Sequence, residues 1–105
     1  MYLKQNKIDK ALLHAKEAFS LAPEIPNIAD TYGQVLLQAG DNKEALKYAS
    51  KAFDLTQGKD SDIALNYVEV LIANSHFDEA KVTIKKIVTN TTEQSDKKTQ
   101  LLSRL

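Results

Sequence analysis

Cysteine is absent from this chain of 105 residues, and glycine occurs only three times. Without cysteine the protein has no disulfide framework, no thiolate metal site and no cysteine nucleophile. The three glycines form neither of the glycine-rich phosphate-binding patterns, G-x-x-x-x-G-K-[S/T] and G-x-G-x-x-G. The 14 basic side chains balance 14 acidic ones, so no overall charge drives binding to nucleic acid or to an anionic membrane surface.

Long apolar runs are also missing. No run reaches the ~18 residues of a membrane span, so we predict no transmembrane segment, and the first four residues do not form a signal peptide. The hydrophobic share of 43% and the charged share of 27% are typical of a globular protein. The length fits one domain with one modest core.

Internal repetition is the strongest positive signal. Six residues return in one register 34 positions later, when residues 11–21 are compared with residues 45–55. The repeated letters are Ala11, Leu12, Ala15, Ala18, Phe19 and Leu21, which become Ala45, Leu46, Ala49, Ala52, Phe53 and Leu55. A shift of 35 positions relates Ile28, Ala29, Tyr32 and Leu36 to Ile63, Ala64, Tyr67 and Leu71. A fixed period of this length indicates a stacked repeat architecture.

Each repeat predicts two helices, because its apolar residues follow one helical face. Between them, Gly40 suits the left-handed end of a helix, and Asp41 can cap the next helix with Glu44 as its capping-box partner. At the equivalent turn Asn74 tolerates the left-handed conformation and Ser75 is the expected cap. No segment alternates like a half-buried strand. We predict an all-α fold with a stub over 1–5 and helices over 8–21, 27–39, 42–56, 62–74, 77–89 and 93–104.

Catalytic and metal-binding patterns are weak. His14 and His76 are far apart in the sequence, whereas a metal site needs clustered ligands. The close carboxylates, such as Asp60 with Asp62, fit helix starts, where they complement the helix dipole. The serines lie in no nucleophile-elbow pattern. We therefore expect no metal, no cofactor and no enzymatic reaction.

The spacing of small and large residues resembles the tetratricopeptide repeat. The resemblance rests on Tyr32-Gly33-x-x-Leu36-x-x-x-Gly40-Asp41-x-x-Glu44-Ala45-x-x-x-Ala49-x-x-Ala52-Phe53. It implies a right-handed superhelical solenoid of antiparallel helix pairs, closed by a C-terminal capping helix. It also implies a non-catalytic scaffold that binds a protein or peptide.

The repeats also depart from the family pattern. Val68 stands where the preceding unit has Gly33, and Ile84 and Ile87 replace two alanines. We expect a partial first repeat over 1–25, repeats over 26–60 and 61–90, and a capping helix over 91–105. Because the first repeat is cut, we interpret the chain as part of a longer array.

A narrower resemblance concerns bacterial repeat proteins linked to the PEP-CTERM/exosortase system and exopolysaccharide export. It rests on the run from Ala29 to Leu37 and on the closing run from Leu101 to Leu105. This resemblance implies a role in the periplasm or cell envelope. Without it, the cytoplasm is the alternative compartment.

The family resemblance implies a concave groove lined by the first helix of each pair. The groove-facing positions are Asn27, Asp30, Gln34, Leu37, Gln38, Asp62, Leu65, Asn66, Glu69 and Ile72. They include three carboxylates and neither Lys nor Arg, and only Asn66 fits the set with which family members hold a peptide carboxylate. We therefore predict a neutral or basic peptide, or a neighbouring repeat, as the partner.

Lysines gather on the second helices instead. They are Lys43, Lys47 and Lys51 in one helix and Lys81, Lys85 and Lys86 in the next. Without interleaved aromatic residues they indicate a solvated convex face, and we expect no nucleic acid partner. Alternatives to a peptide-binding groove are a structural or oligomerisation module, including a homodimer through exposed repeat ends, and, more remotely, a helical nucleic-acid-binding module.

Overall fold

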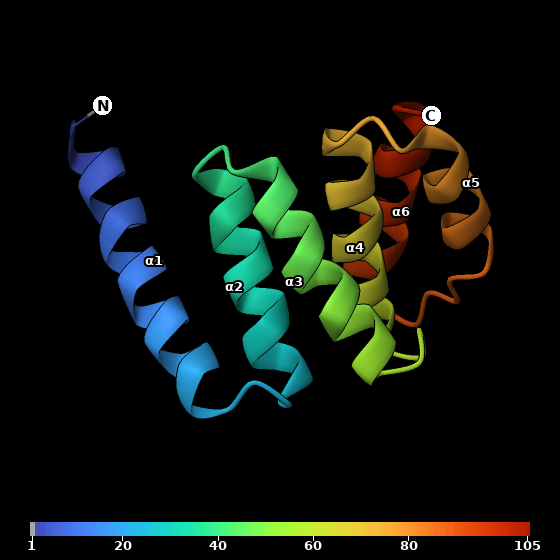
Figure 1. The fold of residues 1–105 in the computed structure, drawn as a ribbon. Helices are drawn as coiled ribbons and strands as arrows, with labels where there is room; N and C mark the ends of the chain where they lie inside the picture. The colour runs from blue at the N-terminus through green and yellow to red at the C-terminus, as the bar shows by residue number, and fades with distance from the viewer. Residues whose placement is uncertain (1) are drawn as a thin grey trace.

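The chain folds into a row of α-helices, seen in a computed structural model that describes residues 2–105, with side chains described from Lys7 onward (Figure 1). The helices are α1 (Tyr2–Leu21), α2 (Pro26–Gln38), α3 (Asn42–Leu55), α4 (Ser61–Ala73), α5 (Phe77–Lys85) and α6 (Thr92–Ser103). Residues 2–105 contain no strand. The predicted all-α fold is confirmed.

The helices form two rows that stack along the molecule. α2 packs against α4, and α4 packs against α6. Within the described residues α1, α3 and α5 make no comparable contact with one another, although each packs against its neighbours in the first row. The row of α2, α4 and α6 is therefore the more closely spaced one and forms the inner, concave side of the right-handed solenoid.

Two helix boundaries differ from the prediction by more than one residue. α1 is continuous, where a stub and a separate helix were expected, because the sequence near residue 6 has no glycine to end a helix as Gly40 does. α5 ends at Lys85, four residues before the predicted end. There Ile87 turns inward and is only 7% exposed, and its carbonyl accepts a hydrogen bond from Lys98 Nζ at 2.8 Å.

The turns within the two helix pairs are built differently. Gly40 has a φ of +87°, and Asp41 Oδ1 accepts a hydrogen bond from the Glu44 amide, as predicted. In the second pair the assignments are wrong, because Ser75 takes the left-handed conformation and does not cap the helix. Asn74 has a negative φ, and its side chain donates to the carbonyls of Asn42 and Val70. That side chain ties the second pair to the start of α3.

Small residues let α2 and α3 approach closely. A Cβ atom on Gly33 would lie 3.1 Å from the Ala49 backbone nitrogen and 3.3 Å from the Ala45 carbonyl oxygen. Ala45 and Ala49 themselves are almost fully buried. Such contact leaves no room for a side chain on one of the two helices, which explains the glycine in this unit.

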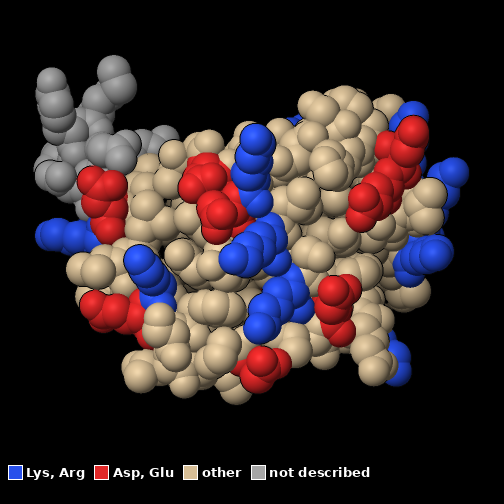
Figure 2. Space-filling view, in the orientation of Figure 1, with Lys and Arg blue, Asp and Glu red and all other residues tan. Residues whose placement is uncertain are grey.

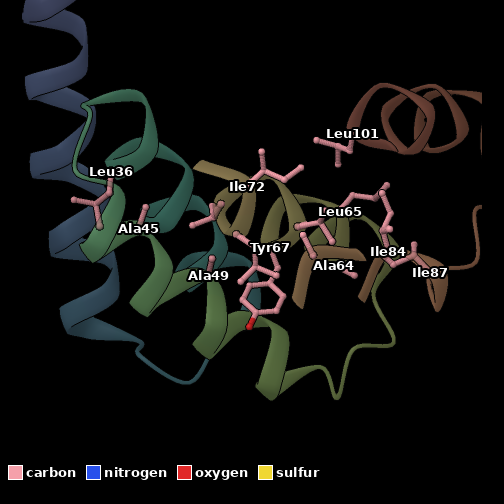
Figure 3. Close-up of a cluster of buried hydrophobic side chains, with 14 residues drawn as sticks. Leu36, Ala45, Ala49, Ala64, Leu65, Tyr67, Ile72, Ile84, Ile87 and Leu101 are labelled. Carbon is pink, nitrogen blue, oxygen red and sulfur yellow. The ribbon is translucent and has the colours of Figure 1, made fainter. Parts of the chain in front are cut away.

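Most of the core surrounds α4, which carries eight buried residues (Figure 3). Aromatic contacts repeat along the stack: the ring centroids of Phe19 in α1 and Tyr32 in α2 are 5.7 Å apart, and those of Phe53 in α3 and Tyr67 in α4 are 4.6 Å apart. These two pairs occupy equivalent repeat positions, so the stacking of one unit on the next is built from the same residue types.

None of the helices in residues 2–105 combines the length and the apolar character needed to cross a membrane.

Candidate functional site

A chain of polar contacts crosses the inner surface from α2 through α4 to α6. Asn66 Nδ2 on α4 donates to both carboxylate oxygens of Asp30 on α2, at 3.2 and 3.1 Å. Asn66 Oδ1 accepts a hydrogen bond from Lys97 Nζ on α6. The same Lys97 Nζ lies 3.3 Å from Glu69 Oε1. These four side chains join the three inner helices on the side where the sequence predicts the groove.

The carboxyl group of Asp30 has a raised pKa. Burial raises the pKa of its carboxyl group, because a desolvated carboxylate loses hydration. The hydrogen bond from Asn66 and the charge of Lys97 act in the opposite direction, and the nearby carboxylates Asp60 and Asp62 add to the increase. A carboxylate on a partner would therefore add negative charge to a site where burial already disfavours the ionised form of Asp30.

The other inner-surface positions fall into three groups. Asn27 and Gln38 are exposed, and Gln38 lies beside Ile8 and Ala11 at a cavity of about 610 Å³ between α1 and α2. Gln34 is half-buried, and among the described side chains its Nε2 is buried without a hydrogen-bond partner.

The second group contains residues that contact α6 or the core. Asp62 is exposed, and its Oδ1 accepts a hydrogen bond from Gln94 Nε2 at 3.0 Å. Leu37 is half-buried and packs against the main apolar cluster.

Leu65 and Ile72 form the third group and correct the predicted groove. They are 1% and 7% exposed, and they belong to the same apolar cluster as Leu101 of α6 (Figure 3). With α6 in place, these two residues line the core and do not reach a partner at the open surface. The sequence prediction placed them in the groove because the family resemblance implies groove-facing residues at these positions.

Lys97 is the inner-surface residue that the sequence prediction missed. The expectation that the groove contains no basic side chain is wrong, because α6 adds Lys97 next to Glu69 and Arg104 at a neighbouring cavity of about 660 Å³. The signal in the sequence was the helical spacing of Gln94, Lys97 and Leu101, which places a basic group on the same face as an inward-pointing leucine.

The outer face carries lysines next to aromatic rings, contrary to the expectation of no interleaved aromatics. Lys47 Nζ lies 5.4 Å from the centre of the Tyr48 ring, and Lys51 Nζ lies 5.4 Å from the centre of the Phe19 ring. Lys51 also lies 3.5 Å from Glu24 Oε1. Figure 2 shows basic side chains in a row along this face with acidic side chains on both sides. The surface is therefore of mixed charge.

The histidines stand apart. His14 is exposed on α1, and His76 precedes α5 with its Nδ1 atom 3.8 Å from Glu79 Oε1. Among the described residues, no group of three or more His, Cys, Asp or Glu side chains is arranged to hold a metal ion.

Comparison with known proteins agrees with this architecture. The family model described as Tetratricopeptide repeat matches residues 36–96. The crystal structure of a thermophilic TPR protein from Thermus thermophilus superposes with a TM-score of 0.77 and 19% sequence identity. The match covers 95% of this chain and 50% of that chain, so the chain spans about half the length of that protein. No curated protein matches the chain. Because the family model covers more than half of the sequence, the chain belongs to the tetratricopeptide repeat family.

Proposed function

We propose that the chain is a non-catalytic scaffold that binds a peptide or partner protein on the inner surface formed by α2, α4 and α6. The observation that carries this proposal is the polar network of Asp30, Asn66, Glu69 and Lys97, whose half-buried hydrogen-bonding groups line a face that spans three helices. Gln34 lies half-buried on the same side of α2, and its amide nitrogen, which is buried without a partner, would reach a peptide carbonyl after a rotation of the side chain.

The charge of this surface favours a neutral or basic partner. Asp30, Asp62 and Glu69 contribute three carboxylates, and Lys97 is already engaged by Asn66 and Glu69. A C-terminal carboxylate would therefore be repelled more than it is attracted, unlike a lysine or arginine side chain. Asn27 and Gln38 extend the surface with uncharged polar groups.

Selection from a random peptide library on the immobilised chain tests this proposal. We expect enriched peptides of zero or positive net charge, whose binding falls at least tenfold in a Gln34→Arg variant. The control variant is Lys47→Glu on the outer face, which should bind as the unmodified chain does. Enrichment of acidic C-terminal peptides, or binding that is insensitive to Gln34→Arg and lost with Lys47→Glu, would contradict the proposal.

A homodimer through a repeat end is the second candidate, and the outer side of α1 favours it. Leu13 and Leu21 are 57% and 87% exposed, and both border a cavity of about 500 Å³. The equivalent of Leu13 in α3 is Lys47, so a solvent-facing repeat position is apolar in α1. Sedimentation of a Leu13→Lys variant tests this candidate: a dimer of the unmodified chain should become a monomer.

The proposed cellular setting is a bacterial cell envelope. The run from Ala29 to Leu37 and the closing run from Leu101 to Leu105 support a bacterial envelope or exopolysaccharide-export system. We also propose that the chain divides into a partial repeat over 1–25, repeats over 26–60 and 61–90, and a capping helix over 91–105. Localisation of the tagged protein in fractionated cells tests the setting, and a cytoplasmic location would contradict it.

A further inference from the structure

α6 is attached to the rest of the solenoid mainly by polar groups. Its inward side presents Gln94, Lys97, Lys98 and Leu101 at helical spacing, Leu105 follows the end of the helix, and Leu101 is the one buried residue of the helix. α4, which holds the equivalent inner position one step earlier, has eight buried residues. Hydrogen bonds and ion pairs in partly exposed positions contribute little net stability, so α6 is the most weakly held of these inner helices.

The surface beneath α6 is nevertheless strongly apolar. Leu65 and Ile72 of α4 and Ile84 of α5 are 1%, 7% and 0% exposed, and they share one cluster with Leu101 (Figure 3). Removal of α6 would open this cluster to water. A surface of this kind needs a cover, and α6 supplies only two leucines for the purpose.

Acidic groups border the same surface. Asp62 accepts a hydrogen bond from Gln94, and Glu69 pairs with Lys97 at 3.3 Å. Without α6, neither carboxylate would keep the partner that α6 provides. The complete recognition pattern is thus an apolar floor with a carboxylate edge, which matches a helix that has leucines and basic residues on one side.

α6 carries its own start signal and can leave as an intact helix. Its cap residue Thr91 accepts a hydrogen bond from the Gln94 amide at 3.1 Å, and Gln94 Oε1 accepts one from the Asn90 amide at 2.8 Å. These two contacts lie within residues 90–94 and do not depend on α4 or α5. Residues 88–91, between the buried Ile87 and α6, are not helical and are exposed or half-buried, so they can act as the hinge.

We propose that the α4–α5 face under α6 is a docking surface for a basic amphipathic helix of a partner protein, which binds by replacing α6. The proposal rests on the scaffold function above and specifies its partner. The partner helix carries basic residues at positions equivalent to Lys97 and Lys98 and leucines at positions equivalent to Leu101 and Leu105. Its basic groups face Glu69 and the carbonyl oxygen of Ile87, as Lys97 and Lys98 do in α6, and its leucines cover the apolar floor.

Binding of a labelled peptide in trans tests this proposal. The peptide is residues 90–105, in its native form and with Lys97→Glu and Lys98→Glu. The protein is the full chain, unmodified and as a Leu101→Ala variant whose own α6 is weakened. We expect the native peptide to bind the variant at least tenfold more tightly than the unmodified chain, because the tethered α6 competes at high effective concentration. The charge-reversed peptide should bind at least tenfold more weakly than the native one.

A matched control and a second measurement keep the test decisive. Thr99→Ala changes an exposed residue of α6 and should leave peptide binding as in the unmodified chain. In the unmodified chain, amide hydrogen exchange should be faster in α6 than in α4. Equal exchange in the two helices would overturn the proposal even if the Leu101→Ala variant did not fold.

Other outcomes assign the surface differently. Equal binding of the native and charge-reversed peptides would overturn the role of Glu69. Dimers of the Leu101→Ala variant that form by exchange of α6 would assign the face to a second copy of the chain and overturn the partner-helix proposal. If library-selected peptides bind while α6 exchange is unchanged, the scaffold function stands and this inference fails.

Discussion

The two helix pairs of this protein occupy the same repeat frame but are packed in opposite ways. In α2–α3, Gly33 faces Ala45 and Ala49, and the backbones approach so closely that a Cβ atom on Gly33 would lie 3.1 Å from Ala49 N. In α4–α5 the equivalent positions are Val68 and Ile84, both fully buried, and the two helices are in less extensive contact. One pair is held by close backbones and the other by large side chains.

This difference explains why the second pair needs α6. Large side chains make the α4–α5 pair more apolar than two helices can cover, since Leu65, Ile72 and Ile84 form one continuous cluster. The α2–α3 pair places Asp30 and Leu37 at the positions of Leu65 and Ile72, so the contact between α2 and the next inner helix, α4, is partly polar. Packing by large residues therefore creates the surface that α6 covers.

Replacing Ile84 by alanine makes the second pair resemble the first at this position, and we expect the largest loss of stability from it. The side chain is fully buried, and truncating a buried isoleucine to alanine costs about 3 kcal/mol of unfolding free energy, because the helices close the cavity only in part. Urea denaturation followed by circular dichroism measures it. The control is Val82→Ala on the exposed side of the same helix. A loss at Ile84 no larger than at Val82 would show that the pair tolerates both packings.

Adding a methyl group at Gly33 tests the close pair. A Cβ atom there would meet backbone atoms of α3 at 3.1 and 3.3 Å, and backbone cannot move aside without separating the helices. We expect Gly33→Ala to lower the unfolding free energy by about 2 kcal/mol, although alanine alone favours a helix by ~1 kcal/mol. Thr31→Ala on the exposed side of α2 is the control, and thermal unfolding compares the two. A stabilised Gly33→Ala variant would contradict the close-packing argument.

The repeats are visible in the sequence because their period depends on the local spacing of residues. The small residues Ala11 and Ala15 recur as Ala45 and Ala49 at positions where helices meet, and this spacing indicated the fold. The early end of α5, which the sequence did not reveal, depends on a distant group. α5 ends early where Ile87 turns into the core and its carbonyl accepts a hydrogen bond from Lys98, a residue of the following helix.

The inner surface was predictable to the level of a helix face and not further. Asp30, Glu69 and Asn66 do lie on the inner side of their helices. Leu65 shares that face by periodicity, yet it is buried because α6 packs on it. The position of Lys97 depends on how α6 docks, which no local pattern of α4 encodes. A lone pair of helices in the sequence cannot reveal which of its residues a third helix will cover.

Tyr67 links the two helices of the second pair through a hydrogen bond. Its hydroxyl donates to Glu79 Oε2, in the loop-proximal part of α5, at 2.8 Å. Burial is the main cause that raises the pKa of Tyr67 to about 12, and this hydrogen bond is the second. We expect Tyr67→Phe to cost about 1 kcal/mol at neutral pH, because a single hydrogen bond is lost and Glu79 is exposed to water. Chemical denaturation at pH 7 measures this loss.

The same variant has a distinct alkaline signature. The unfolded tyrosine loses its proton near its ordinary pKa of 10, whereas folded Tyr67 keeps its proton up to about 12. The stability that Tyr67 contributes is therefore complete below pH 10 and is lost as the pH rises to 12. The difference in stability between the unmodified chain and Tyr67→Phe should shrink over this window. A constant difference from pH 9 to pH 12 would contradict the raised pKa.

The smallest expected effect concerns Asp30. This residue lies at the polar contact between α2 and α4, and the equivalent residue at the contact between α4 and α6 is Leu65. Burial raises the pKa of Asp30 above its ordinary value of 3.8, although Asn66 and Lys97 oppose the increase. The folded protein thus holds the Asp30 proton at pH values where the unfolded chain has lost it. Stability from this group is greatest below the ordinary pKa and falls as the pH rises through the folded pKa.

An Asp30→Asn variant removes this titration and keeps an acceptor for the Asn66 amide. We expect the stability of the unmodified chain relative to Asp30→Asn to fall between pH 3.5 and pH 7, because burial makes the folded carboxyl group hold its proton more tightly than the unfolded one, against the opposing effects of Asn66 and Lys97. Urea denaturation at several pH values measures it. A relative stability that rises with pH would mean that Lys97 outweighs burial, and that the inner surface stabilises carboxylates. In that case the step from α2 to α4 would be held by charge pairing, as the contact of Glu69 with Lys97 is at the step from α4 to α6.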